Sequence, residues 1–209
     1  MPGVQPKKWQ LIATGAGVIV YQLLSKRAMR VLLSVRTKNV GQGYGITGGG
    51  FVEVVAVDAL PIGSIVQTAD DAHREAHEEN KGFAAVISAD AFLERAQPVG
   101  TFHVRTADSN RVHGVTMYAL RAISYVEWMH FAALEPGVDI DGKVERDGPL
   151  LECLVEWTPD ITRRTPEAAI TMTHLDGAPI QASEFFHGHE VHAIATIAWN
   201  AEKGRLWLR

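Results

Sequence analysis

The segment of residues 68–83, TADDAHREAHEENKGF, restricts the possible folds more than any other part of the chain. Thr68 can cap a helix that runs over about residues 69–80. At about 100° per residue, the small residues of this helix share one face: Ala69, Ala72 and Ala76. Because such small side chains let a helix backbone lie close to a sheet, we expect this helix to pack directly on strands.

Other segments supply the strands and helices around it. Apolar, β-prone runs predict strands over residues 11–24, 28–36, 51–57, 99–106, 112–121 and 150–157. Further helices are expected over residues 88–96 and 183–203, and Gly82 is a plausible stop for the first helix. This order predicts an α+β fold, an α/β/α sandwich in which helices cover a mixed β-sheet. We expect a single domain over residues 1–209, with insertions around 54–67 and 123–148, the second being a long ordered loop.

Composition excludes several classes of protein. The chain has 209 residues, of which 46% are hydrophobic, so it is not a disordered chain. Its net charge of -4 and its lack of a basic stripe argue against a nucleic-acid polymer as partner. The single cysteine, Cys153, permits no intrachain disulfide and fits a reducing cytoplasm. The apolar stretch 11–24 is too short to span a bilayer, and a buried strand is the expected structure.

Three carboxylates on the predicted helix need a physical explanation. Glu75, Glu78 and Glu79 fall on one face, where like charges at these spacings repel each other. Glu78 and Glu79 also lie near the helix C-terminus, where the helix dipole disfavours anions. One interpretation is a solvated acidic surface with an Arg74–Glu78 pair. The other is a site for a hard divalent cation, because carboxylate oxygens suit Mg²⁺ or Mn²⁺.

The surrounding sequence favours the cation site. REAHEE, residues 74–79, matches R-E-x-x-E-E, and GITGGGFVE, residues 45–53, is a glycine-rich turn before it. These two motifs resemble the Nudix hydrolase family, whose box reads G-x5-E-x7-R-E-U-x-E-E-x-G-U, with U a bulky apolar residue. The strand VLLSVR, residues 31–36, and the segment ECLVEWTPDI, residues 152–161, are similar to flanking parts of that family.

The box departs from the family pattern between the turn and the helix. From Gly50 to Arg74 the chain has 24 positions where the box has 14, an insertion of ten. Counting back from Arg74, Val66 stands where the box has its first glutamate. The small Ala76 takes the first bulky position, and one extra residue precedes Gly82. The helix chemistry is therefore retained, and the loop that leads into it is rebuilt.

The resemblance implies Mg²⁺-dependent hydrolysis of a diphosphate linkage in a nucleoside diphosphate derivative, such as a nucleoside triphosphate, ADP-ribose or another nucleotide sugar. It implies a metal site made by Glu75, Glu78, Glu79 and the backbone carbonyl of Gly49. Arg74 would orient the glutamates through charge-assisted hydrogen bonds. The expected partner is a small nucleotide, with no membrane, and a homodimer is a reasonable default.

The remaining site residues are assigned with alternatives. Glu152 is the first candidate for the general base, and Glu53 is the second; Glu152 is equally explained as a solvent-facing strand residue. Arg36 and Gly50 are expected at the substrate with Glu53, although Arg36 can also be an exposed strand-end arginine. The cluster His187, His189 and His192 is better explained as a helix face than as a zinc site, because no cysteine or acid completes it.

Two other functions stay open. The missing box glutamate and the insertion fit a nucleotide-binding or regulatory module of the same fold without turnover. An isomerase acting on an isoprenoid diphosphate is the third possibility. The intact Arg74, Glu75, Glu78 and Glu79 favour the hydrolase.

Overall fold

A computed structural model describes residues 10–36, 42–53, 68–105, 111–138, 142–144, 146–186 and 188–205. The predicted insertion 54–67, including Val66, and His187 lie outside these ranges. The described part contains an eight-stranded sheet with strand order β10-β9-β2-β1-β7-β6, in which β3 pairs with β2 and β4 pairs with β1. The pairing of β1 with β7 is parallel and the other pairings of this sheet are antiparallel, so the sheet is mixed as predicted.

Most of the observed strands coincide with the apolar, β-prone runs of the sequence. Their bounds are β1 Gln10–Ser25, β2 Ala28–Arg36, β3 Gly43–Gly45, β4 Gly48–Glu53, β6 Gln97–Arg105, β7 Arg111–Arg121, β9 Leu151–Trp157 and β10 Ile170–His174. A separate pair is formed by β5 (Asn80–Lys81) and β8 (Glu135–Pro136). Neither β3, β10 nor this pair was predicted from the sequence.

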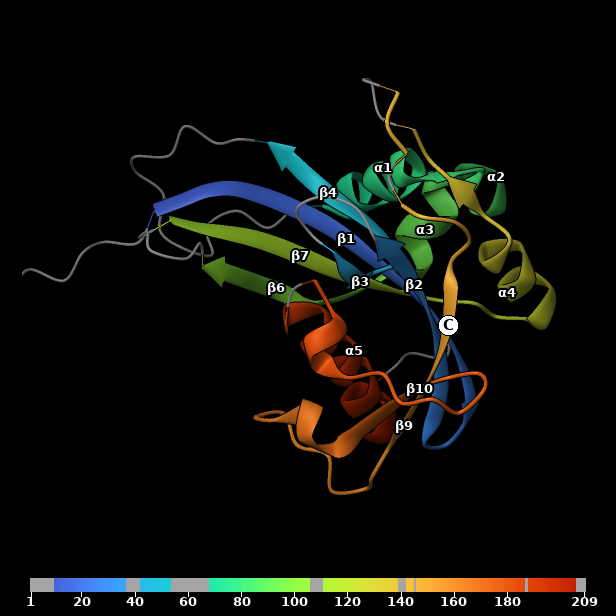
Figure 1. The fold of residues 1–209 in the computed structure, drawn as a ribbon, viewed down its shortest axis with the longest axis vertical. Helices are drawn as coiled ribbons and strands as arrows, with labels where there is room; N and C mark the ends of the chain where they lie inside the picture. Colours follow the sequence, from blue (N-terminus) through green and yellow to red (C-terminus); the bar gives the residue numbers. More distant parts are fainter. Residues whose placement is uncertain are drawn as a thin grey trace, which may run out of the picture.

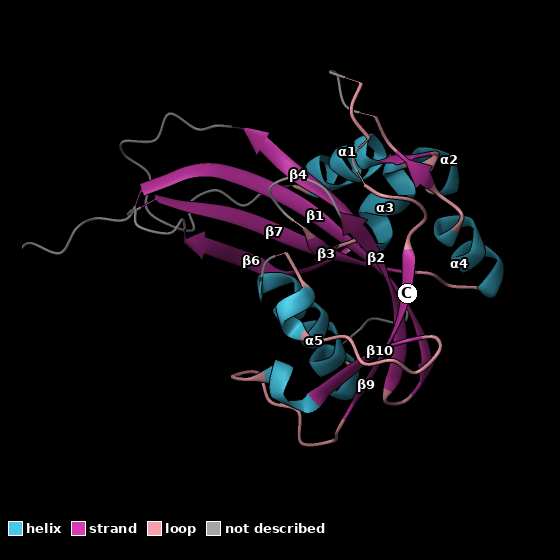
Figure 2. Ribbon diagram, viewed as in Figure 1, coloured by secondary structure: helices cyan, strands magenta, loops and turns pink. Residues whose placement is uncertain are grey.

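Helices cover both faces of the sheet (Figures 1 and 2). On one face lie α1 (Ala69–Glu79), α2 (Phe83–Val86), α3 (Ala89–Arg95) and α4 (Tyr125–Ala132). On the other lies α5 (Gly188–Glu202), with short 3-10 turns at Pro166–Ala169 and Ala182–Glu184. The predicted α/β/α sandwich is confirmed. None of the described helices is long and apolar enough to cross a membrane.

Each face of the sheet has its own hydrophobic cluster. Under α5, Val31 and Met117 of the strands pack with Val191 and Ile194 of the helix. Under α1 to α4, strand residues such as Val18 pack with a second set of fully buried side chains, which includes Ala72, Ala76, Phe83, Trp128 and Phe131. Successive β1 residues alternate between the two clusters, as the two-residue period of a strand requires.

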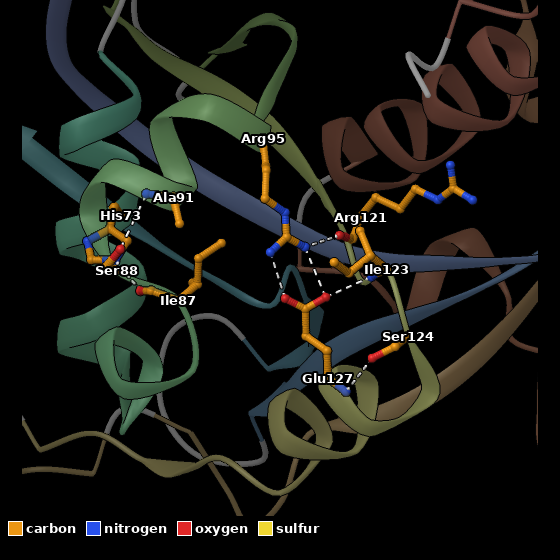
Figure 3. Close-up of polar contacts among 9 residues, drawn as sticks. All are labelled: His73, Ile87, Ser88, Ala91, Arg95, Arg121, Ile123, Ser124 and Glu127. Atoms are coloured by element: carbon orange, nitrogen blue, oxygen red, sulfur yellow. Dashed lines mark hydrogen bonds and ion pairs between the residues drawn. The ribbon is translucent and has the colours of Figure 1, made fainter. Parts of the chain in front are cut away.

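Hydrogen bonds and an ion pair connect α3, α4 and the end of β7 (Figure 3). The Arg95 guanidinium of α3 donates to both carboxylate oxygens of Glu127 at 2.7 and 2.9 Å, and also to the carbonyl of Arg121 at 2.7 Å. Glu127 in turn accepts the backbone N–H of Ile123 at 2.7 Å. Since bidentate pairs of this kind are geometrically strict, α3, α4 and the end of β7 are held as one unit.

Three local predictions are wrong. The segment 123–148 is not only a loop, because it contains α4 and β8. α1 ends before Gly82: Asn80 is its C-cap and enters β5, while Gly82 has φ +91° and precedes α2. The last helix begins at Gly188, not Ser183, because Phe185 is extended and bridges to Tyr44 of β3.

Candidate functional site

The base of the site is the contact between α1 and the glycine strand β4. The Thr68 side chain accepts the N–H of Asp71, as expected of the helix cap, and the Asp71 carboxylate accepts the N–H of Thr68, which completes a capping box. A Cβ added at Gly48 would lie only 2.9 Å from the Ala76 Cα. The backbones of helix and strand therefore approach as closely as the small residues allow, which brings the glutamates of α1 beside β4.

The C-terminal end of α1 is clamped by the segment that was predicted to be an insertion. Asn80 is buried and donates to the carbonyls of Thr47 and Ala76 at 2.9 and 3.0 Å. Arg146, which is 3% exposed, donates to Asn80 Oδ1 at 3.1 Å and to the carbonyls of Leu134 and Gly148. Burial lowers the pKa of Arg146, and the negative charge of Glu79 opposes that shift. Arg146 therefore links α1 to the chain around β8, and it was not among the predicted site residues.

Gly137 completes this clamp. Its N–H donates to the carbonyl of Glu79 at 2.7 Å, and a Cβ at this position would lie 1.8 Å from the carbonyl oxygen of Glu78. The backbone after β8 therefore crosses the last turn of α1 at a distance that only glycine permits.

Arg74 joins two of the predicted acids. Its guanidinium lies 2.8 Å from Glu75 Oε1 and 3.0 Å from Glu78 Oε1. Glu75 is buried, whereas the side chain of Glu78 is 57% exposed. Burial raises the pKa of Glu75; Arg74 opposes the shift and the charge of Glu78 adds to it. The buried Glu75 thus lies in an environment where its negative charge is only partly compensated.

Glu79 has different partners from the other two acids. Its carboxylate accepts the Arg36 guanidinium at 2.8 Å and the backbone N–H of Gly49 at 3.0 Å. Arg36 ends β2 and Gly49 lies in β4, so this one side chain connects α1 with two strands. The three glutamates therefore do not present their carboxylates to a single point: Glu75 and Glu78 meet at Arg74, and Glu79 meets Arg36.

A cavity of about 250 Å³ lies next to Glu79. The cavity lies where β2 and β4 both pair with β1, one after the other along the same edge. β2 pairs with residues 21–25 of β1, and β4 pairs with residues 14–18. Its lining residues come from five strands, the turn between β3 and β4, the last residue of α1 and the chain at the start of α5. They include Ser34, Arg36, Gly45, Ile46, Gly49, Glu79, Met117, Phe186, His189 and Glu190. Of the residues expected at metal or substrate, Arg36, Gly49 and Glu79 are brought together here.

Glu190 is the residue of this cavity that sequence reasoning missed. It is 5% exposed in the first turn of α5. His189 of the neighbouring histidine cluster also lines the cavity, whereas Glu190, which lies between His189 and His192 in the sequence, belongs to no recognised motif. A buried carboxylate in an otherwise apolar helix face is the signal that could have marked it.

Several expected residues lie elsewhere. Glu152 does not line the cavity; it faces Arg30 on β2, with 3.2 Å between the charged atoms. Gly50 pairs with Ala16 through the backbone, and Glu53 pairs with Thr14 in the same ladder, but the side chain of Glu53 lies outside the described atoms. His192 pairs with Glu167 and does not line the cavity.

Solved structures show which fold this is. A MutT/nudix family protein from Enterococcus faecalis superposes with a TM-score of 0.50 at 14% sequence identity, over 97% of this chain and 69% of its own. The chain has the Nudix fold. A NUDIX hydrolase from Nitrosomonas europaea gives a TM-score of 0.42 at 12% identity, over 94% of this chain and 76% of its own. The NUDIX domain of Shewanella oneidensis NrtR, complexed with ADP ribose, gives 0.39 at 14%, over 69% and 75%.

Sequence comparison adds nothing to this result. No family model matches the chain, and no curated protein matches it. Likeness at 14% identity establishes the Nudix fold, and a fold alone does not determine the reaction, which depends on the residues of the site.

The acids of this Nudix fold match a divalent cation in donor chemistry but only in part in geometry. Glu75 and Glu78 are adjacent carboxylates, and the raised pKa of Glu75 reflects a charge that a cation would compensate. Among the described residues, however, no three His, Cys, Asp or Glu side chains are grouped closely enough to hold a metal ion. The pair Glu75 and Glu78 is thus the part of the predicted ligand set that fits.

Proposed function

We propose that this chain is a Nudix-type hydrolase that cleaves the diphosphate linkage of a nucleoside diphosphate derivative with the help of Mg²⁺. Nucleoside triphosphates, ADP-ribose and other nucleotide sugars belong to this class. The observation that carries the proposal is the position of Glu79 and Arg36, which meet at the edge of a cavity beside the glycine strand. The neighbouring Arg74, Glu75 and Glu78 supply further charge on the same helix.

The chemistry of each side chain in the cavity suggests a different role in binding the substrate. Arg36 uses one of its five N–H donors on Glu79, which leaves the others able to bind phosphate oxygens. Glu79, fixed by Arg36 and by the Gly49 N–H, keeps this arginine aimed at the cavity. The apolar wall formed by Ile46 and Met117 excludes water from the rest of a bound nucleotide.

Glu75 and Glu78 would hold the cation, with Glu79 and the Gly49 carbonyl as further candidate ligands. A bound divalent ion neutralises the diphosphate and lowers the pKa of a coordinated water. Arg74, which contacts both Glu75 and Glu78, orients the two carboxylates and limits their mutual repulsion while no ion is bound.

The test is a panel of nucleoside diphosphate derivatives assayed for release of phosphate, pyrophosphate or nucleoside monophosphate with Mg²⁺ and with EDTA. We expect turnover that requires the ion and that falls about a hundredfold or more in Glu78→Gln, on the scale of losses seen at metal sites. Glu94→Gln, the same change at an exposed residue of α3, is the matched control and should keep wild-type turnover. Equal turnover in EDTA, or an unaffected Glu78→Gln, would contradict the proposal.

A nucleotide-binding module without turnover is the second candidate. The observation in its favour is that Glu79 is already paired with Arg36 and with a backbone N–H. Nucleotide binding by calorimetry without hydrolysis of any compound in the panel, in Mg²⁺ or Mn²⁺, would select the module over the enzyme.

A further inference from the structure

The two oxygens of the Glu79 carboxylate have separate donors within the chain. Oε1 accepts the Arg36 guanidinium at 2.8 Å, and Oε2 accepts the backbone N–H of Gly49 at 3.0 Å. The side chain of Glu79 is only 11% exposed, so water competes little with either bond. A charge-assisted pair in such a position is stronger than the same pair at the open surface.

A second guanidinium acts on the same carboxylate. Arg146, which is buried and donates to Asn80 at the end of α1, also interacts electrostatically with Glu79. One negative charge therefore faces two positive charges, those of Arg36 and Arg146. To bind Glu79 Oε1, a divalent cation would have to displace Arg36 and approach a group of residues whose net charge is already positive.

Glu75 and Glu78 have the opposite balance of charge. A single guanidinium, that of Arg74, serves both carboxylates at 2.8 and 3.0 Å. Asp71, one turn earlier on α1, adds a further negative charge that acts on Glu75. The side chain of Arg74 is 47% exposed, so solvent can accept it if a cation takes its place. A divalent cation between these two carboxylates therefore relieves their repulsion.

We propose that Glu75 and Glu78 hold the divalent cation without Glu79, and that Glu79 instead anchors Arg36, whose guanidinium supplies a second positive charge at the diphosphate. This inference rests on the proposed function, since it concerns the cation and the phosphate groups of that reaction. Arg36 and Glu79 both line the cavity. Arg36 keeps further N–H donors for phosphate oxygens, and its charge depends neither on pH nor on the concentration of metal ions.

Mn²⁺ binding tests this assignment without turnover. Electron paramagnetic resonance measures the free Mn²⁺ while the full chain is titrated in the absence of nucleotide. We expect Glu78→Gln to weaken Mn²⁺ binding at least about tenfold, whereas Glu79→Gln, the same substitution one residue later, weakens it less than about threefold. Glu94→Gln, at an exposed residue of α3, is the control and should keep the wild-type affinity.

Arg36 provides the reverse test. Arg36→Met removes the guanidinium from the Glu79 carboxylate, so Mn²⁺ should bind at least about threefold more tightly than it does to the wild type. Adding Glu79→Gln to Arg36→Met should cancel this gain, because the gain comes from the released carboxylate and not from a general loss of positive charge. Circular dichroism confirms that each variant is folded.

A loss of more than about threefold in Glu79→Gln overturns the inference, and so does a wild type that binds no Mn²⁺. If Glu79→Gln does not fold, Arg36→Met decides, and an unchanged or weaker affinity for Mn²⁺ overturns the inference. The expected pattern of Mn²⁺ binding without hydrolysis of the panel refutes the enzyme and leaves the assignment of Glu79 standing. Mg²⁺-dependent hydrolysis together with loss of Mn²⁺ binding in Glu79→Gln refutes this assignment alone.

Discussion

Replacing Gly48 by alanine tests whether close contact between helix and strand positions the site. The added methyl would lie 2.9 Å from the Ala76 Cα, 3.2 Å from the Ala76 Cβ and 2.8 Å from Asn80 Nδ2. Two of these three atoms cannot rotate away, because one belongs to the helix backbone and one is a Cβ. The helix must therefore move outward by several tenths of an ångström.

The cost follows from the contacts that this movement disturbs. Overpacking of a tight contact costs about 1–3 kcal/mol. The bonds of Asn80 to Thr47 and Ala76 are strained at the same time, which adds about 1 kcal/mol. We expect a loss of about 2–4 kcal/mol in the free energy of unfolding. For a chain of this size that is a fall in Tm of roughly 5–15 °C.

Urea denaturation and calorimetry provide the measurement, with Gly188→Ala as the matched control. A Cβ at Gly188 meets nothing within 4 Å, and its φ is not in the left-handed region. The control should change the free energy of unfolding by less than about 1 kcal/mol. If Gly48→Ala is as stable as the control, the helix does not lie where its glutamates require it, and the argument for the site fails.

Three further predictions concern other parts of the chain. Arg146→Met leaves buried acceptors on Asn80, Leu134 and Gly148 without their donor, so urea denaturation should show a loss of about 3 kcal/mol or more, and a wild-type midpoint would contradict the clamp. Glu75→Gln should raise the free energy of unfolding at neutral pH in EDTA. A carboxyl group whose pKa is raised on folding stabilises the folded state below its ordinary pKa of 4.5, and this stabilisation is lost as the pH rises. The difference in free energy of unfolding between the variant and the wild type should therefore vanish in acid. A pH-independent difference, or a loss at neutral pH, would contradict this account of Glu75. Cys153 is fully buried and its pKa is raised to about 12 by burial, so iodoacetamide at mildly alkaline pH should label it only after unfolding, as mass spectrometry can show.

Local sequence patterns predicted most of the sheet and the position of α1. The strand over residues 28–36 has the bounds of β2, Ala72 and Ala76 of the alanine face are buried, and Ala76 lies against Gly48 of β4 as expected. These features depend on periodicity and capping, which act over a few residues. The capping box at Thr68 and the small residues of α1 are of this kind.

Long-range contacts explain what the sequence could not predict. Ile170 to His174 forms β10 because it pairs with β9, and nothing within five residues requires it. Arg146 lies 66 positions from Asn80, and Glu190 reaches the cavity only because the first turn of α5 lies beside Gly45 of β3. The shared metal site of Glu75, Glu78 and Glu79 stays a prediction: the carboxylate of Glu79 pairs with Arg36, whereas those of Glu75 and Glu78 pair with Arg74.

The long strand β1 has a consequence for how the protein melts. Its Ile19 and Tyr21 belong to the cluster under α5, while Val18 and Val20 belong to the cluster under α1. Along one edge it holds first β4 and then β2, and along the other it holds β7. Neither helical layer can unfold without exposing one face of β1 and disrupting the pairing of β1 with its neighbouring strands. The two layers should therefore lose their structure together, as a single cooperative unit.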